Sequence, residues 1–476
     1  MKRILVRSGK NPFDVTTTEE TLQRNVIGNN VGNLVFATAA HKLLTTPDTE
    51  VVSNRNVVDP ARAEAINEEY DAFVIPLANA FRPSFERHLN TLTDLITRLT
   101  IPVTVLGVGA QSDLEYDLEC LAPLNASVRR FVSAVLDRSP SIGVRGEFSA
   151  GYLESLGFRD VEVIGCPSMF MFGADLKVTK RTTRLDADSR IGMYLTKGVD
   201  RLDELVANHD RYRQLRYIPQ DIKDLELLYW GDGSIGAGRT ATFPADRSHP
   251  MLTDGRIDYY LDPWTWMTGL ADRDFTFGTR IHGNIVALLA GTPGFVVAHD
   301  SRTLELSRYF EIPYRKVTDP GGLDAAELYE AADYTAVMAG HNARFERMTG
   351  FLRTHDLDNC FAHPQTVSEF DTRLRATAYP GPETVWRGDD DGRLHHRIGQ
   401  LREQQTRTAD RINGLVRRVR ELEKLPQRVE RLETELAATR EQLAQVRKYV
   451  AGQEARLSAR LRRRLARRFR PGRTGR

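Results

Sequence analysis

The C-terminal part of the sequence repeats an apolar residue every seven positions. One heptad position is aliphatic with a single polar exception, in the series Leu394, Leu401, Thr408, Leu415, Leu422, Val429, Leu436, Leu443, Val450 and Leu457. A second core position holds Ile398, Ile412 and Val419, and near Pro426 it shifts by one residue to Leu425, Leu432 and Val446. This repeat predicts an α-helical coiled coil over residues 394–457, interrupted or kinked at Pro426. We expect a homo-oligomer or a partner helix, because a lone helix would leave an apolar seam in water. The repeat leaves parallel and antiparallel pairing open.

The first 374 residues show a different pattern, in which short apolar runs alternate with segments of helical period. The predicted strands include Ile4–Val6, Ala72–Ile75, Val103–Val108, Val161–Ile164, Ile191–Leu195, Tyr217–Pro219, Phe275–Phe277 and Phe295–Ala298. The predicted helices include Asn33–Leu44, Phe85–Leu99, Ala126–Leu136 and Glu147–Leu156. This alternation predicts an α/β fold with parallel sheets covered on both faces. We expect two Rossmann-like domains, residues 1–180 and residues 181–374, with a ligand-binding cleft between them.

The segments after residue 374 differ in composition and charge. Residues 375–393 are rich in Pro, Gly and Asp, which predicts a linker before the coiled coil. The formal net charge is +2, yet residues 456–476 contain ten arginines and no acid, so residues 1–455 are mildly acidic. We therefore expect an anionic partner for a basic tail over residues 458–476, with an anionic membrane surface favoured over nucleic acid. A solvated tail is the alternative.

Cysteine usage and hydropathy favour the cytoplasm, with a peripheral position at the inner face of the membrane if the tail binds there. The three cysteines, Cys120, Cys166 and Cys360, form neither a disulfide framework nor a metal-spaced cluster. No apolar run is long enough to cross a bilayer, and Arg7 interrupts the apolar stretch that a signal peptide would need. We expect no metal and no cofactor.

The strongest local signal lies between Asp274 and Pro293, where a short strand runs through a small turn into a helix. Thr279 is the predicted N-cap, and Arg280 and His282 then lie in the first turn. A helix N-terminus and a guanidinium both favour an anion. An imidazole beside a bound anion can transfer protons near neutral pH. The alternative is that both side chains only cap the helix or pair with acids.

Two further segments place glycine or arginine before a helix. Ser141–Gly157 delivers Arg145 from a strand to a helix start, although a surface ion pair of Arg145 with Glu147 is an alternative. The loop Gly28–Asn33 could bring backbone N–H groups to a ligand, and a simple glycine turn explains it equally well.

In three segments the sequence resembles the polysaccharide pyruvyl transferase family. The block Gly278–Pro293 resembles the Arg-x-His-Gly helix-start signature of that family, and Arg145–Gly157 resembles its second signature. The loop Gly28–Gly32 is similar to its N-terminal glycine–asparagine motif. The resemblance implies a GT-B-like arrangement of two Rossmann-like halves, with phosphoenolpyruvate as donor substrate and a sugar of a surface polysaccharide or related glycan as acceptor.

The resemblance also implies roles for individual residues. His282 and Arg280 would be catalytic and contact the donor, and Arg145 would bind an anion. Further substrate-binding residues would be Gly28, Asn29, Gly32, Thr279, Gly283 and Arg302. The sequence departs from the family pattern at Asn33 and Cys166, where acids are common, and at Arg302, where a lysine is typical.

Two alternative functions remain open. A nucleotide-sugar glycosyltransferase of GT-B type would use an arginine and a helix N-terminus to bind a diphosphate. A non-catalytic scaffold with a transferase-like fold would act through its coiled coil and tail. Trp264 and Trp266 could stack on a sugar ring, although such residues more often anchor a core.

Overall fold

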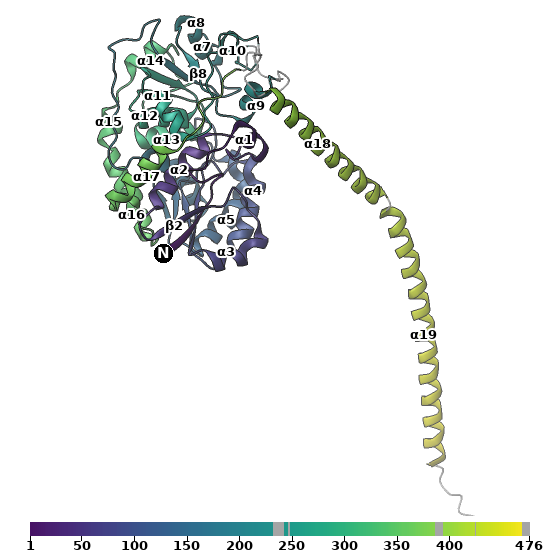
Figure 1. Ribbon diagram of the computed structural model, residues 1–476. Coiled ribbons are helices and arrows are strands. Elements are labelled where there is room, and N and C mark those ends of the chain that lie inside the picture. The colour runs from purple at the N-terminus through teal and green to yellow at the C-terminus, as the bar shows by residue number, and fades with distance from the viewer. Residues whose placement is uncertain (232–241, 246–247, 386–393, 424, 469–476) are drawn as a thin grey trace, which may run out of the picture. The chain divides into compact units, whose positions relative to one another are not determined.

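The computed structural model describes residues 1–231, 242–245, 248–385, 394–423 and 425–468. The chain divides into two compact units, residues 1–389 and residues 390–476. Figure 1 shows the elements of both units. Among the described residues, no helix combines the length and apolar character that a membrane span requires.

The first half of the larger unit is built on a parallel sheet. Its four strands run in the order β2-β1-β3-β4 and comprise β1 (Lys2–Val6), β2 (Thr49–Ser53), β3 (Ala72–Pro76) and β4 (Val103–Leu106). A parallel pair, β5 (Ile142–Val144) and β6 (Val161–Val163), continues the sheet through a bridge between Val108 and Val144. Both faces of β3 are buried, which explains its continuous apolar run.

The second half repeats this arrangement. Its sheet has the order β11-β10-β9-β7-β8 and is also parallel. The strands are β7 (Ile191–Tyr194), β8 (Arg216–Tyr217), β9 (Phe275–Gly278), β10 (Gly294–Ala298) and β11 (Tyr314–Lys316). When the strands are numbered within each half, both halves have the order 2-1-3-4-5, and in the first half β6 follows β5. This is the flavodoxin-like doubly wound order, and it differs from the six-stranded Rossmann order.

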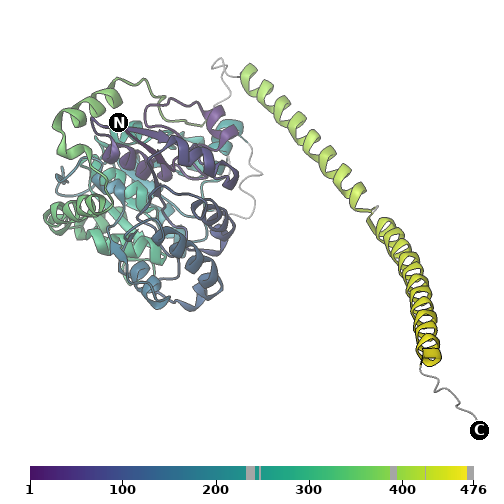
Figure 2. The ribbon, with the colours of Figure 1, turned by 90° about the horizontal axis from the view of Figure 1, so that it is seen from below.

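Helices cover both sheets, so the predicted parallel α/β class is confirmed (Figures 1 and 2). The helices of the first half are α1 (Thr18–Arg24), α2 (Gly32–Leu44), α3 (Ala63–Glu69), α4 (Glu86–Ile96), α5 (Asn125–Leu136) and α6 (Glu147–Ser155). Those of the second half are α7 (Leu202–Val206), α8 (Asn208–Arg211), α9 (Ile222–Trp230), α10 (Pro250–Thr253), α11 (Pro263–Leu270), α12 (Ile281–Leu289), α13 (Ser301–Phe310), α14 (Ala325–Ala331) and α15 (Thr335–Ala339). In α4, Leu89, Leu92 and Ile96 are buried at helical spacing, while charged residues occupy the opposite face.

The chain after the second sheet returns to the first half. Two helices, α16 (His341–Thr354) and α17 (Pro364–Ala376), make these contacts. His355 Nε2 lies 3.0 Å from the carbonyl oxygen of Ser141, and the Lys42 ammonium lies 2.6 Å from Asp371 Oδ1. Beyond α17, the Tyr379 hydroxyl donates to the carbonyl of Pro12 at 2.7 Å. The first part of the predicted linker therefore adheres to the larger unit, and its residues 386–393 lie outside the described residues.

The Lys42–Asp371 ion pair should be a major support of this return. The Lys42 side chain is 1% exposed and also lies 4.9 Å from the ring centroid of Phe172. Removing one partner of a buried pair leaves an uncompensated charge and costs about 3–5 kcal/mol. We expect Lys42→Met to lower the free energy of unfolding by this order in urea denaturation. The double variant Lys42→Met/Asp371→Leu should recover most of the loss, and equal losses in both variants would contradict a role for the charge.

The described residues of the smaller unit form two helices, α18 (Leu394–Glu423) and α19 (Leu425–Arg468). The helix α18 ends at Glu423 and α19 begins at Leu425, next to Pro426, where the sequence predicts an interruption. The helical character of this region is confirmed, and its pairing as a coiled coil stays a prediction. Residues 469–476 of the predicted tail lie outside the described residues.

Candidate active site

Basic side chains follow the carboxyl ends of strands in both sheets. Arg145 comes directly after β5, His282 follows β9, and Arg302 follows β10. Arg82 lies beyond β3, on a segment that pairs with the loop after β4 through Phe81 N–H and the carbonyl of Gly109 at 3.1 Å. The two halves meet here, since the Ser112 N–H donates to Ser301 Oγ at 2.7 Å. Carboxyl ends of parallel strands are where doubly wound folds bind ligands.

Arg145 is buried without a partner for much of its guanidinium. The residue is 1% exposed, and neither Nε nor Nη2 has a hydrogen-bond partner among the described residues. Its side chain lies over Gly109, where an added Cβ would lie 2.2 Å from Arg145 Nε. The surface ion pair with Glu147, the alternative considered from the sequence, is therefore wrong. A buried guanidinium without hydrogen-bond partners destabilises the free protein, and a bound anion would supply the missing partners.

Two other arginines lie close to this guanidinium. Burial lowers the pKa of Arg82, and the positive charges of Arg302 and Arg145 lower it further. Arg82 Nε is buried and has no hydrogen-bond partner in the described part of the chain. Arg302 is braced by Asp300, whose Oδ2 accepts from its Nη2 at 2.9 Å. These guanidiniums outnumber the nearby carboxylates, so the cluster favours a small anion with more than one negative charge.

His282 lies beside this arginine cluster. Burial, and then the charges of Arg145 and Arg302, lower its pKa to about 3. Its Nε2 lies 3.8 Å from the sulfur of Cys166, whose own pKa burial raises. A Cβ placed on Gly32 would lie 3.0 Å from the Cβ of His282, so the N-terminal loop also reaches this residue. His282 remains partly exposed, and it is neutral in the free protein at pH 7.

The N-terminus of α6 already holds an anionic side chain. Glu305 accepts from the N–H of Ser149 at 2.7 Å and from its hydroxyl at 3.0 Å. Burial raises the pKa of Glu305 to about 7, against the opposing effects of Arg145 and the Ser149 hydrogen bonds. Anion binding by Arg145 therefore depends on its side chain, because a carboxylate of the protein occupies this helix start.

The N-cap of α12 is Arg280, so the predicted N-cap at Thr279 is wrong. The helix begins at Ile281, and the buried Thr279 hydroxyl has no partner among the described residues. The guanidinium of Arg280 is hydrogen-bonded to Asp221 and donates from Nε to the carbonyl of Leu195 at 3.1 Å. Arg280 is thus tied to neighbouring elements of the second half, and its contact with a donor, like that of Gly283, stays a prediction.

The loop Gly28–Asn33 is a structural turn in which the backbone donors are already used. The N–H of Gly28 donates to the carbonyl of Asn25, that of Asn29 to Asn25 Oδ1, and that of Gly32 to Asn30 Oδ1, at 2.8–2.9 Å. The prediction that Gly28, Asn29 and Gly32 offer backbone donors to a ligand is therefore wrong. Asn33 Nδ2 donates to the carbonyls of Ile27 and Gly28 at 3.0 Å each. A carboxylate could not donate these bonds, which explains the departure at residue 33.

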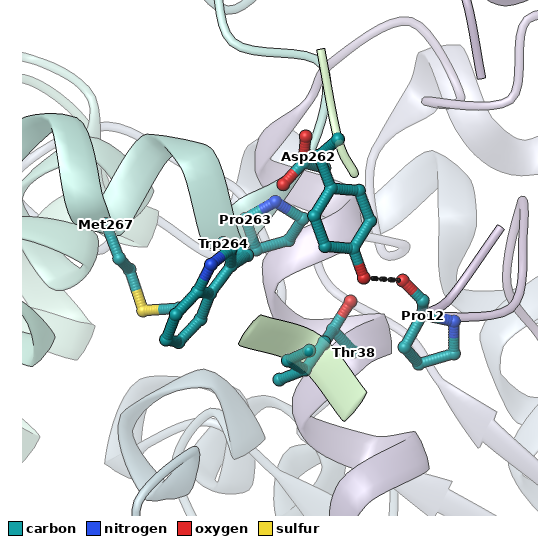
Figure 3. Close-up of a pocket in the computed structure, with 8 residues that line it drawn as sticks. Pro12, Thr38, Asp262, Pro263, Trp264 and Met267 are labelled. Carbon is teal, nitrogen blue, oxygen red and sulfur yellow. Dashed lines mark hydrogen bonds between the residues drawn. The ribbon is translucent and has the colours of Figure 1, made fainter. Parts of the chain in front are cut away.

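The two tryptophans of α11 differ in exposure. Trp266 is fully buried and anchors the core, which contradicts a stacking role for this residue. Trp264 is partly exposed and lines a small pocket (Figure 3). The pocket lies between α2, α11 and the segment after α17, and is lined by Pro12, Thr38, Asp262, Pro263, Trp264, Met267, Leu374 and Tyr379. Trp264 remains the candidate for stacking on a sugar.

Sequence reasoning missed three members of the site. Arg82 carries no motif, and its position beyond the carboxyl end of β3 is the only signal that could have found it. Asp300 and Glu305 lie on or next to the start of α13, after the strand that the sequence did identify. Asp300 holds Arg302, two residues away, whereas Glu305 acts through Ser149 of the other half, a contact that a local pattern does not reveal.

These features define an α/β protein of two doubly wound halves, with a cluster of arginines where the carboxyl ends of their strands meet. The family model described as polysaccharide pyruvyl transferase matches residues 81–301. The resemblance predicted from the sequence is confirmed over this segment. The segment contains Arg82, Arg145 and His282, and it ends one residue before Arg302. A comparison with curated proteins finds no match.

Solved structures show only a distant likeness. The M. jannaschii UDP-GlcNAc 2-epimerase with UDP-GlcNAc and UDP has a TM-score of 0.40 and 11% identity, covering 74% of this chain and 99% of that chain. The S. aureus MnaA structure with UDP has a TM-score of 0.36 and 12% identity, covering 80% and 99%. Anabaena Alr3699/HepE with UDP and glucose has a TM-score of 0.36 and 12% identity, covering 78% and 100%. At these scores the likenesses carry no argument about function.

Proposed function

We propose that this chain transfers a pyruvyl or enolpyruvyl group from phosphoenolpyruvate to a sugar hydroxyl of a surface polysaccharide or related glycan. The observation that carries the proposal is the buried guanidinium of Arg145, which lies beside Arg82, Arg302 and His282. Its Nε and Nη2 have no hydrogen-bond partner in the part of the chain that the structure describes. The family assignment of residues 81–301 supports transferase chemistry. We also propose that the two halves are arranged as in GT-B glycosyltransferases.

The charges of the cluster suit this donor. Phosphoenolpyruvate carries a phosphate and a carboxylate, and guanidiniums bind both groups through paired N–H donors. Arg145 and Arg82 have unused buried donors, and Arg302 is held in place by Asp300. A site preorganised in this way stabilises charge as it develops on the leaving phosphate.

His282 is the proposed proton carrier. A proton added to the methylene carbon makes C2 electrophilic, the sugar oxygen bonds to C2, and the bond from C2 to the phosphate oxygen breaks. If the methyl group then returns its proton to His282, the product is an enolpyruvyl ether, and the departing phosphate takes the proton of the sugar hydroxyl. If a second sugar hydroxyl bonds to C2 instead, the product is a pyruvate ketal, the methyl group keeps one hydroxyl proton, and the phosphate takes the other. A positioned acid or base contributes about 10²–10⁴-fold in rate.

Donor binding tests the proposal directly. We expect phosphoenolpyruvate to raise the melting temperature, because a ligand at 100 times its Kd adds about 2.7 kcal/mol of stability. UDP- and GDP-sugars should have no such effect, and inorganic phosphate should have a smaller one. Stabilisation by nucleotide-sugars alone would replace the proposal with a glycosyltransferase, and no stabilisation by any of them would favour a non-catalytic scaffold.

Donor binding should also take up protons. The pKa of His282 is about 3 in the free protein, below its usual value of 6.5, so the imidazole is neutral near pH 7. A bound polyanion favours the imidazolium and raises this pKa, so binding at pH 6.5 should consume protons and strengthen as the pH falls. Titration calorimetry in buffers of different ionisation enthalpy measures the uptake. His282→Gln should reduce it, and Glu305→Gln controls for the carboxyl whose pKa is about 7. An unchanged uptake in His282→Gln would contradict the assignment.

We also propose that the basic tail binds anionic lipid. Described residues in its first part include Arg460, Arg462 and Arg463, and each arginine near such a surface contributes about 1 kcal/mol. We expect the full chain to sediment with vesicles containing phosphatidylserine and to dissociate as salt is raised. Deleting residues 458–476 should abolish sedimentation without changing the donor-induced thermal shift. Equal sedimentation of both chains would exclude the tail as the anchor.

A further inference from the structure

The described part of α19 carries an apolar seam that a single chain leaves in water. Leu436 is 51% exposed and Leu443 is 53% exposed. The other aliphatic residues of the seam, Leu425, Val429, Leu432, Val446, Val450 and Leu457, are exposed to a similar degree. A continuous stripe of this length on a helix indicates a covering partner. The polar and charged residues within and beside the seam indicate which partner covers it.

We infer that α19 pairs with α19 of a second copy of this chain, parallel and in register. In the heptad frame, the a positions are Val429, Leu436, Leu443, Val450 and Leu457, and the d positions are Leu425, Leu432, Thr439, Val446 and Gln453. The next core position after Leu457 is Arg460, so the paired region ends there. The pairing therefore covers Leu425–Leu457.

The polar core residues favour this alignment. In a parallel pair in register, Thr439 meets Thr439 of the second copy, and Gln453 meets Gln453. A glutamine side chain both donates and accepts, so two of them can satisfy each other. The two antiparallel registers that place a opposite d instead set Thr439 against Val450 or Leu443, and Gln453 against Leu436 or Val429. Each leaves a polar group facing an aliphatic one, which is costly when buried.

The flanking charges favour the same alignment. In parallel pairs, a g residue meets the e residue five positions on in the other strand. Glu435 then meets Arg440, an opposite-charge contact that two-fold symmetry makes twice. In antiparallel pairs, e meets e: one register sets Arg440 against Arg447 and Glu433 against Glu454, and the other sets Arg440 against itself and Glu433 against Arg447. Like charges therefore oppose the first register, and the polar core contacts described above oppose the second.

Cross-linking of the full chain separates the orientations. In a Cys120→Ser background, Leu432→Cys alone and Leu457→Cys alone should each form a covalent dimer under mild oxidation. Thr434→Cys, at an outward f position, is the matched control and should not. In the antiparallel register that sets Leu432 against Leu457, only a mixture of the two variants would cross-link, and that result would overturn the inference.

Mass and charge reversal complete the test. Sedimentation equilibrium should give twice the 53.8 kDa chain mass, and a monomer or any higher multiple would overturn the inference. Glu435→Arg should raise the dimer dissociation constant at least tenfold, and adding Arg440→Glu should restore it. Failure of the second change to restore the dimer would contradict parallel pairing. The double variant keeps the same residue types, so it also controls for lost helicity, which circular dichroism measures.

Discussion

Arg145→Met should abolish donor binding while leaving the free protein at least as stable as before. The guanidinium is buried, and two of its nitrogens have no partner among the residues that the structure describes, so its removal relieves a cost of several kcal/mol in the free state. The same removal takes away a preorganised donor to the anion, which costs about 10²–10³-fold in kcat/KM. Melting curves with and without phosphoenolpyruvate measure stability and donor binding, and initial rates measure kcat/KM.

The opposite pattern would identify Arg145 as structural. Arg87, on the exposed face of α4, offers a matched control, and Arg87→Met should change neither stability nor donor binding. If Arg145→Met lowers the melting temperature sharply and the remaining folded protein binds donor normally, the site assignment fails. Gly109→Ala tests the same position from the other side, because the added methyl group would displace the Arg145 side chain.

His282→Gln should reduce kcat by about 10²–10⁴-fold and change donor affinity much less. Glutamine retains hydrogen-bonding capacity but cannot carry a proton near neutral pH, so binding and proton transfer are separated. Single-turnover release of phosphate measures the chemical step. The exposed His88 of α4 gives the control His88→Gln, which should retain full turnover. Full turnover by His282→Gln would assign proton transfer to another group, with Glu305 the first to examine.

The alternation of strands and helices was predictable because each buried parallel strand leaves a continuous apolar run. The runs at Ala72, Val103 and Phe275 correspond to β3, β4 and β9. The edge strands β2 and β11 were missed because their residues are only partly buried and mostly polar. The order of the strands depends on which face of the sheet each helical connection crosses, and a local sequence pattern does not specify that face.

Within the site, the sequence identified side chains that stand at strand-to-helix turns. Arg145 and His282 were found in this way and Arg302 through the family resemblance, and the structure brings all three together. The predicted backbone donors of the Gly28–Asn33 loop failed because Asn25 and Asn30 use them, a network that glycine spacing does not reveal. Arg280 was expected beside the donor. Its guanidinium is hydrogen-bonded to Asp221, which lies 59 residues away in the sequence, and a local pattern does not reveal this pairing.

The return of α16 and α17 to the first sheet bears on how the larger unit acquires its fold. His355 packs against the strand that delivers Arg145, and Asp371 neutralises Lys42 on α2. Residues 1–180 made alone would leave that lysine without a counterion and a core surface open. We therefore expect the first sheet to gain its full support only when synthesis has reached the end of α17.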